Sequence, residues 1–321
     1  MVNNLTDSGY QEFISQLGSI ITTRFHNEDV SDIADFARNY FFNSYLGELL
    51  EKPIEDVYGE VISTWQFVEK FDGEKTKVRI LNPTIENDGW QSTHTVIEVI
   101  MVDMPFIVDS IRMAINKRDI TIHSLINTVL DVERNDSGIL TNTSVLVDST
   151  EKKGRKESIL HIEIDRQSNA DKRLALEDEI SSILSDLHLL VHDFPKMLEK
   201  VNEAKAERES LQGSDEDALN KSYIDLLDWL RNDNFTFLGY REYRYETKEK
   251  VNEFVGITGS ELGTLKTDKE VDLLDDVSDC SLLTRETLIF AKSSTLSRIH
   301  RPAYPELLIV NRVDIDGNII G

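Results

Sequence analysis

The chain has 321 residues, of which 40% are hydrophobic and 29% are charged, and its formal net charge is −24. That length and apolar content are enough for a sizeable buried core, spread over two or three domains. Because so acidic a surface repels nucleic acid and anionic membranes, we expect neither as a partner.

The cysteine content and the N-terminal sequence indicate a compartment. Cys280 is the single cysteine, so no disulfide can form within the chain, which fits a reducing environment. The first residues, MVNNLTDSGYQEF, lack the basic and then apolar pattern of a signal peptide. No apolar run reaches the roughly eighteen residues that a membrane helix needs. The sequence therefore predicts a soluble, cytoplasmic protein.

The first 88 residues are predicted to form an N-terminal α+β domain. Apolar residues recur at three- and four-residue spacing between residues 10 and 50, which predicts helices. Residues 57 to 81 are predicted to form strands on either side of an Asp72-Gly73 turn, since Asp-Gly between extended runs favours a hairpin. The stretch NPTIENDGW that follows is interpreted as a linker, with a domain boundary near residue 88.

Residues 89–168 are predicted to form a second domain. Its first strand is the apolar run from Val96 to Val102, broken only by Glu98, and a helix follows the Asp-Met-Pro turn. Apolar and polar residues then alternate in two further strands, 120–130 and ESILHIEID, the latter with His161 and Glu163 on one side. The order strand–helix–strand–strand–helix predicts an α+β fold with an antiparallel sheet, the ferredoxin-like βαββα module.

The rest of the chain is predicted to be a connector and a third domain. A long helix with a charged tail covers residues 169–220, and Pro195 is expected to kink or end it. Extended runs after a short helix make residues 221–321 either a second module of the same kind or simply a β-rich domain. The closing sequence VDIDGNIIG is interpreted as a hairpin cut in its second arm, so we expect the front part of a longer protein.

A search for known chemical motifs predicts no catalytic, cofactor-binding or metal site. The chain has no G-x-G-x-x-G after a strand, no P-loop, no G-x-S-x-G and no H-E-x-x-H. Cys280 lacks a marked histidine partner and is interpreted as a packing residue. His188 and His192 have the spacing of a zinc pair, but Leu189 and Leu190 crowd them. We interpret these histidines as a polar helix flank.

The Asp-Met-Pro turn is the first candidate for ligand binding. A short turn from strand to helix leaves backbone N–H groups free, and such groups attract a carboxylate. The candidates for a ligand-facing patch are Asp103, Met104, Pro105 and His123. The alternative is that the turn is only a part of the scaffold.

A basic cluster late in the chain is the second candidate. The segment SSTLSRIHRPAY gathers Arg298, His300 and Arg301 in an otherwise acidic chain. A guanidinium matches the geometry of carboxylate or phosphate, so these residues are candidates for an anion contact. Pairing with acidic residues of a neighbouring domain is the alternative.

Several long segments carry a resemblance to a known family. The Asp-x-Pro pattern between strand and helix resembles the ACT module, a regulatory fold that often binds amino acids. The segments VDMPFIVDSIRMAINKRDITIHSLIN, LLDWLRNDNFTFLGYREY, GSELGTLK and SSTLSRIHRPAYPELLIV resemble, in order, blocks of the N-terminal region of the large bacterial NAD-dependent glutamate dehydrogenases. The resemblance covers roughly residues 93 to 321, and residues 1 to 90 match only in helical character.

The resemblance implies a regulatory and assembly segment that is not itself catalytic. It implies a homo-oligomer, a downstream catalytic domain in the same chain that uses NAD and glutamate, and a possible amino-acid effector. Where many amino-acid-binding ACT modules have glycine, this chain has Phe106, which is expected to fill the space at the turn. The alternatives are a standalone amino-acid sensor and a purely structural oligomerisation module.

Overall fold

The computed structural model describes residues 8–24, 30–42, 44–145, 154–210, 217–248, 251–267, 273–274, 288–313 and 318–321. The chain separates into two compact units, Met1–Leu184 and Ser185–Gly321. The predicted boundary near residue 88 falls inside the first unit, because helices before it and strands after it share one hydrophobic core. Cys280 lies outside the described residues.

The predicted helices between residues 10 and 50 are confirmed. They are α1 (Ser8–Arg24), α2 (Val30–Tyr40) and α3 (Leu46–Glu51). Each buries the apolar side chains that recur at helical spacing, and aromatic rings of α2 form the centre of this packing. Phe36 stacks on Tyr40 at a centroid distance of 5.5 Å, and Trp65 meets Phe36 edge-on at 5.3 Å.

The prediction of a strand from residue 57 is wrong, because α4 (Ile54–Val68) occupies this stretch. The helix is buried on more than one side, so β-branched and aromatic residues occur on several faces and hide the helical period. The predicted strand after the Asp-Gly turn is confirmed as β1 (Lys77–Leu81). The predicted linker contains a one-turn helix, α5 (Ile85–Asp88), which ends at Gly89 with φ 74°.

Gly59 in α4 lies directly against the indole of the buried Trp90. A Cβ at residue 59 would be 2.3 Å from the Cβ of Trp90, closer than any real contact. We therefore expect Gly59→Ala to lower the free energy of unfolding by about 1–3 kcal/mol, as overpacked cores do. Denaturant unfolding measures this change.

Gly18 provides the matched control for that substitution. It lies in the middle of α1, and among the described residues no neighbouring atom comes within 4 Å of the position that a Cβ would occupy. Gly18→Ala should therefore raise the free energy of unfolding by about 0.5–1 kcal/mol through helix propensity. Equal effects of the two substitutions would show that Trp90 does not pack as described.

Five antiparallel strands form the sheet of the first unit, in the order β1-β2-β5-β3-β4. The four strands not yet described are β2 (Thr95–Val102), β3 (Ile122–Arg134), β4 (Leu140–Val145) and β5 (Arg155–Ile164). They include the three strands predicted between residues 89 and 168. The register of β3 against β5 shifts between Ile122 and Ser124, which makes His123 the extra residue of a bulge.

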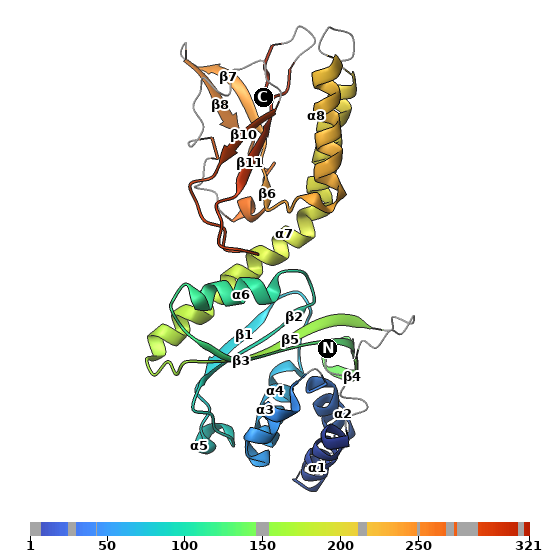
Figure 1. The fold of residues 1–321 in the computed structure, drawn as a ribbon, viewed down its shortest axis with the longest axis vertical. Coiled ribbons are helices and arrows are strands. Elements are labelled where there is room, and N and C mark those ends of the chain that lie inside the picture. The colour runs from blue at the N-terminus through green and yellow to red at the C-terminus, as the bar shows by residue number, and fades with distance from the viewer. Residues whose placement is uncertain are drawn as a thin grey trace. The chain divides into compact units, whose positions relative to one another are not determined.

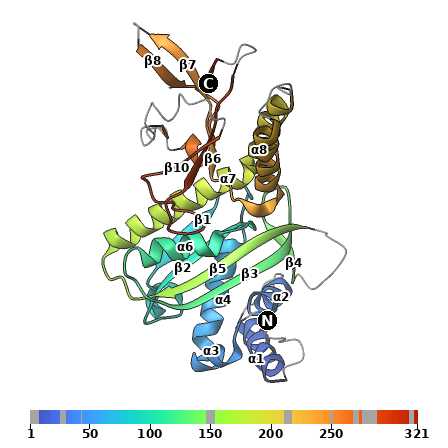
Figure 2. The ribbon, with the colours of Figure 1, turned by 45° about the horizontal axis from the view of Figure 1, so that its top comes forward.

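Helices cover both faces of this sheet (Figures 1 and 2). On one face, Ile100 and Ile159 belong to the core that α1, α2 and α4 complete. On the other face lie α6 (Ile107–Asn116) and the first part of α7 (Ala170–Ser210). Because side chains alternate along a strand, neighbouring residues of β2 and β5 serve different cores. Every residue of β5 from Glu157 on is therefore buried.

Pro195 does not end α7, so one of the two predicted outcomes is wrong. The helix continues past the proline to Ser210. The second unit also contains α8 (Asp217–Trp229) and a π-helical turn, Leu230–Asn234, which match the predicted short helix.

The described strands of the second unit form three antiparallel pairs. They are β6 (Gly239–Tyr240) with β9 (Leu262–Gly263), β7 (Tyr243–Lys248) with β8 (Val251–Gly256), and β10 (Leu288–Lys292) with β11 (Glu306–Val310). A bridge between Val313 and Ile319 agrees with the predicted terminal hairpin. Among the described residues, these pairs make the unit β-rich without a continuous βαββα sheet.

Asp193 on α7 holds the turn after β9 in the second unit. Its Oδ2 accepts a hydrogen bond from the Gly263 N–H at 3.0 Å and forms an ion pair with Lys266 at 2.5 Å. The Asp193 side chain is fully buried, so its partners would lose a charged acceptor on substitution. We expect Asp193→Asn to destabilise this unit by about 2 kcal/mol, with faster amide hydrogen exchange at Gly263 than in the parent chain. Unchanged exchange would contradict the anchoring role.

Candidate functional site

The predicted ligand turn, Asp103-Met104-Pro105, connects β2 to α6. The Asp103 carboxylate accepts a hydrogen bond from Ser158 Oγ at 2.6 Å. The Asp103 N–H donates to the Lys156 carbonyl at 2.9 Å, so this residue is tied to the start of β5. Met104 and Pro105 complete the turn.

Phe106 occupies the N-cap position of α6 with φ 71° and ψ 6°. This left-handed backbone favours glycine and costs a larger residue roughly 1–2 kcal/mol. That the Phe106 ring closes the turn to ligands stays a prediction.

The structure places His123 far from the Asp103 turn. Asp103 contacts Lys156 at the start of β5, whereas His123 contacts Asp165 just after its end. Nine residues of extended chain separate those two partners, which is about 30 Å. The four candidates therefore do not form one patch, because β2 ends beside the start of β5, whereas the start of β3, with His123, lies beside the end of β5.

His123 instead belongs to a pair of histidines that each contact a carboxylate. Its Nε2 lies 2.8 Å from Asp165 Oδ1, and its ring lies 4.2 Å from the ring of His94. Hydrogen bonds from the Thr121 backbone and from His123 lower the pKa of Asp165 to about 2. His94 Nδ1 lies 3.1 Å from Glu163 Oε2, so this pair continues inward to a buried group of charges.

The most unusual feature of the first unit is this buried charge cluster between α4 and the sheet. It consists of three carboxylates and three basic side chains: Lys52, Glu60, Arg79, Glu98, His161 and Glu163. Isolated charges are expensive to bury, so such groups are normally paired or bound to a metal. The imidazole of His161 lies at the centre of the cluster and is fully buried.

His161 faces all three carboxylates of the cluster. Its Nε2 lies 3.8 Å from Glu60 Oε1 and 3.7 Å from Glu163 Oε1. Its Nδ1 lies 3.7 Å from Glu98 Oε1. These distances exceed a normal hydrogen bond, and neither ring nitrogen has a hydrogen-bond partner among the described residues. Burial alone would lower the pKa of His161, but the surrounding carboxylates outweigh burial and raise it to about 9.

The other members of the cluster hold the carboxylates in place. Lys52 Nζ lies 3.0 Å from Glu60 Oε2 and 2.7 Å from Glu163 Oε1. Burial would raise the pKa of Glu163, but His161 and Lys52 lower it. Glu98 forms an ion pair with Arg79 and accepts a hydrogen bond from Thr64 Oγ1 at 2.6 Å.

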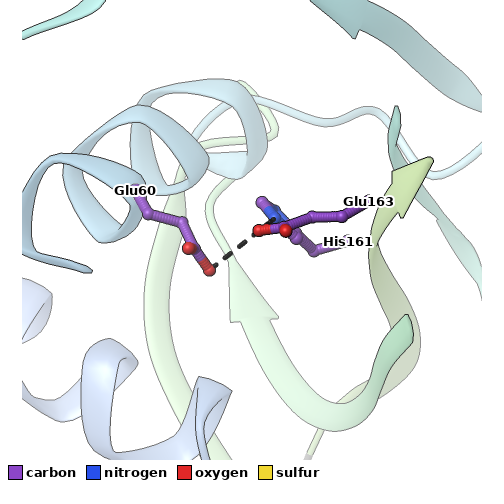
Figure 3. A group of neighbouring side chains, drawn as sticks. All are labelled: Glu60, His161 and Glu163. Carbon is purple, nitrogen blue, oxygen red and sulfur yellow. Dashed lines mark ion pairs between the residues drawn. The ribbon is translucent and has the colours of Figure 1, made fainter. Parts of the chain in front are cut away.

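Glu60, His161 and Glu163 are also arranged as metal ligands. Figure 3 shows their side chains pointing toward one another, Glu60 from α4 and the other two from β5. One ligand atom from each residue lies within 4.8 Å of the others. His188 and His192, the pair considered from the sequence, lie on α7 with ring centroids 6.5 Å apart.

Partial signals for the cluster are present in the sequence. Glu98 interrupts an apolar strand, and His161 and Glu163 share one face of another strand. A charged residue in a strand buried on both faces needs a partner. Nothing in the sequence identified Lys52, Glu60 and Arg79 as those partners.

A second group of buried charges lies at the other end of the sheet. The Glu157 carboxylate accepts hydrogen bonds from both Arg134 and Arg155. Arg134 also donates to the carbonyls of Val68 and Glu69, which ties α4 to β3. The two arginines line a hollow of about 660 Å³ beside the β3–β4 turn.

The basic candidates of the second unit have separate surroundings. Arg298 forms an ion pair with the buried Asp186 of α7, a residue of the same unit. His300 has a left-handed backbone with φ 69°, and Arg301 is exposed. The structure thus supplies an intra-unit acidic partner for Arg298. The anion-binding role of these residues stays a prediction.

Comparison with known proteins identifies the family. Residues 36–180 match the family model described as glutamate dehydrogenase, ACT1 domain. Over 318 residues the chain is 34% identical to the NAD-specific glutamate dehydrogenase of Halomonas elongata, and over 328 residues it is 34% identical to that of Pseudomonas aeruginosa. The chain belongs to the NAD-specific glutamate dehydrogenase family. The matches cover 97% and 98% of the chain but only 20% of each relative.

The ACT1 match of this glutamate dehydrogenase family member spans the complete sheet of the first unit. It begins in α2 and ends in α7, so it includes every member of the buried charge cluster. In the part of the chain that the structure describes, no helix combines the length and apolar character needed to cross a membrane.

Proposed function

We propose that this chain is the N-terminal regulatory and assembly segment of a large NAD-specific glutamate dehydrogenase and is not itself catalytic. The observation that carries the proposal is how much of this chain, and how little of each relative, the alignments cover. Nearly all of the chain aligns with about a fifth of two such enzymes, and the aligned part contains an ACT1 domain. The whole protein would convert L-glutamate, NAD and water to 2-oxoglutarate, ammonia and NADH in the cytoplasm, with NAD bound outside this segment.

The topology of the first unit supports a ferredoxin-like arrangement of the ACT type. A βαββα unit formed by β2, α6, β3, β5 and α7 places its third strand between its first and second, as the sheet order β2-β5-β3 does. β1 comes earlier in the chain and pairs with the free edge of β2. We propose that β1 takes the edge position that a fourth strand has in that arrangement.

The Asp103 turn supports assembly more than effector binding. Its carboxylate is engaged with Ser158, and a phenylalanine occupies the left-handed position where glycine would leave space. Under this proposal, the segment connects subunits of a homo-oligomer and the downstream catalytic domain of the same chain. Binding of an amino-acid effector by this segment is the second part of the proposal.

Light scattering and a thermal-shift screen against the twenty amino acids and NAD test this role together. A ligand that binds the folded state raises the melting temperature by mass action. We expect self-association, or a shift with one or two amino acids, and Phe106→Gly should strengthen any shift that arises at the turn. A strict monomer that responds to none of these ligands would contradict the proposal.

A further inference from the structure

The buried charge cluster contains polar atoms that the protein itself leaves without hydrogen bonds. Among the described residues, Glu60 Oε1 and both ring nitrogens of His161 have no partner at hydrogen-bond distance, although both side chains are at most 1% exposed. Leaving a buried polar atom unsatisfied costs about 1–3 kcal/mol, and more for a charged group. An unsatisfied atom in a native site therefore calls for an explanation, such as an ion.

Two of these atoms, Glu60 Oε1 and His161 Nε2, face one common position, together with a Glu163 oxygen that Lys52 holds. Glu60 Oε1 and Glu163 Oε1 both face His161 Nε2, at 3.8 and 3.7 Å, and the three residues offer ligand atoms that lie within 4.8 Å of one another. A cation between them would lie a little over about 2 Å from each atom, close to the Zn–N and Zn–O distances of protein sites. We propose that Glu60, His161 and Glu163 bind one divalent transition-metal cation, with Zn²⁺ and Mn²⁺ as the best candidates.

The ligand set suits these metals. One imidazole and two carboxylates supply three nitrogen and oxygen ligands, which is the number of protein ligands in open zinc sites that leave a further position for water. Imidazole selects transition metals over Mg²⁺ and Ca²⁺, which prefer oxygen ligands alone. The same three side chains would therefore bind Mg²⁺ much more weakly.

The surroundings of His161 match those of a metal ligand. Its second nitrogen, Nδ1, faces Glu98 Oε1 at 3.7 Å, and Glu98 is fixed by Thr64 and Arg79. A carboxylate behind a ligating histidine orients the ring and raises its basicity, and such carboxylates commonly accompany metal-bound histidines. Glu98 is thus a positioning residue for the proposed site.

Lys52 is the competitor of the metal in this site. Its ammonium bridges Glu60 Oε2 and Glu163 Oε1, and its side chain is 27% exposed, so it can withdraw to solvent. Without metal, the three negative charges of Glu60, Glu98 and Glu163 are balanced by Lys52, Arg79 and the protonated His161, and His161 releases its proton when it becomes a ligand. With Lys52 withdrawn, a divalent cation and Arg79 balance the three carboxylates. The metal ion and the Lys52 ammonium therefore cannot be bound to Glu60 and Glu163 at the same time.

Calorimetric titration of the chelator-treated chain with Zn²⁺, Mn²⁺ and Mg²⁺ tests the site. We expect one equivalent of Zn²⁺ or Mn²⁺, a rise in melting temperature, and tetrahedral-type visible absorption when Co²⁺ replaces the metal. Lys52→Met should tighten binding roughly tenfold, because it removes a like charge from the site. An effect in this direction cannot arise from misfolding. Weaker or unchanged binding in Lys52→Met would overturn the proposal.

Two ligand variants and a surface control complete the test. Glu60→Gln keeps the shape of the side chain and should abolish binding, as should His161→Gln, with folding checked by circular dichroism. His188→Gln with His192→Gln removes the partly exposed histidine pair of α7 and should leave binding unchanged. The proposal would be overturned if the parent chain bound no metal. It would also be overturned if the His188 and His192 variant lost binding while Glu60→Gln and His161→Gln kept it. None of these outcomes depends on the proposed function.

Discussion

Glu157→Leu is expected to lower the free energy of unfolding of the first unit by about 3–5 kcal/mol, the cost of breaking a buried ion pair by removing one partner. The Glu157 side chain is fully buried, and it is the one carboxylate that Arg134 and Arg155 share among the described ion pairs. Arg134 is only 7% exposed, so its guanidinium would stay buried without a counter-charge. Denaturant unfolding followed by far-UV circular dichroism measures the loss.

Two controls separate this charge effect from a general loss of packing. Glu133→Leu makes the same replacement of glutamate by leucine at an exposed position on β3. It should change the free energy of unfolding by no more than about 0.5 kcal/mol. Arg134→Met combined with Arg155→Met and Glu157→Leu removes all three charges and should recover part of the stability. A loss of less than about 1 kcal/mol for Glu157→Leu would contradict the described role of the pair.

The stability of the metal-free chain is expected to decrease as pH rises from about 6.5 to about 9. The pKa of His161 is raised to about 9 in the fold, against an ordinary value of about 6.5 in the unfolded chain. Below the unfolded value both states hold the proton, and the stabilisation is fully present. Between the two values only the folded chain holds it, so stability falls and is lost above the folded pKa, by an amount on the order of 3 kcal/mol.

Unfolding free energies in chelator-containing buffers across that pH range test the effect. Substitution His161→Gln removes the titrating group, so the slope of stability against pH should become shallower. Lys52 keeps its charge across the range because Glu60 and Glu163 outweigh its burial and raise its pKa. A stability independent of pH between about 7 and 9, or the same slope in both proteins, would contradict a protonated His161 in the cluster.

The sheet of the first unit could be predicted from the sequence because its strands have a clear pattern. The apolar run of β2 and the alternation in β5 follow directly from the period of a strand. The pattern failed for α4, whose buried Val57, Val61 and Trp65 recur at helical spacing among other buried residues. A helix packed on several sides loses the polar stripe that distinguishes it from a strand.

The candidate site could be predicted only in part, because its residues come together through tertiary packing. His161 and Glu163 were correctly placed on one face of a strand. Their partner Glu60 lies about a hundred positions earlier, in the helix that was predicted as a strand. Asp103 and His123 are closer in sequence, but antiparallel pairing with β5 places them at opposite ends of the sheet.

Glutamate-dependent reduction of NAD by the purified chain is the most direct test of the proposed regulatory and assembly role. The NAD-specific glutamate dehydrogenase of Pseudomonas aeruginosa, assayed in the same buffer, is the positive control. We expect no NADH above the buffer background from this chain at any glutamate concentration. NADH formation that requires glutamate and disappears on heat denaturation would show that the segment is catalytic and would contradict the account.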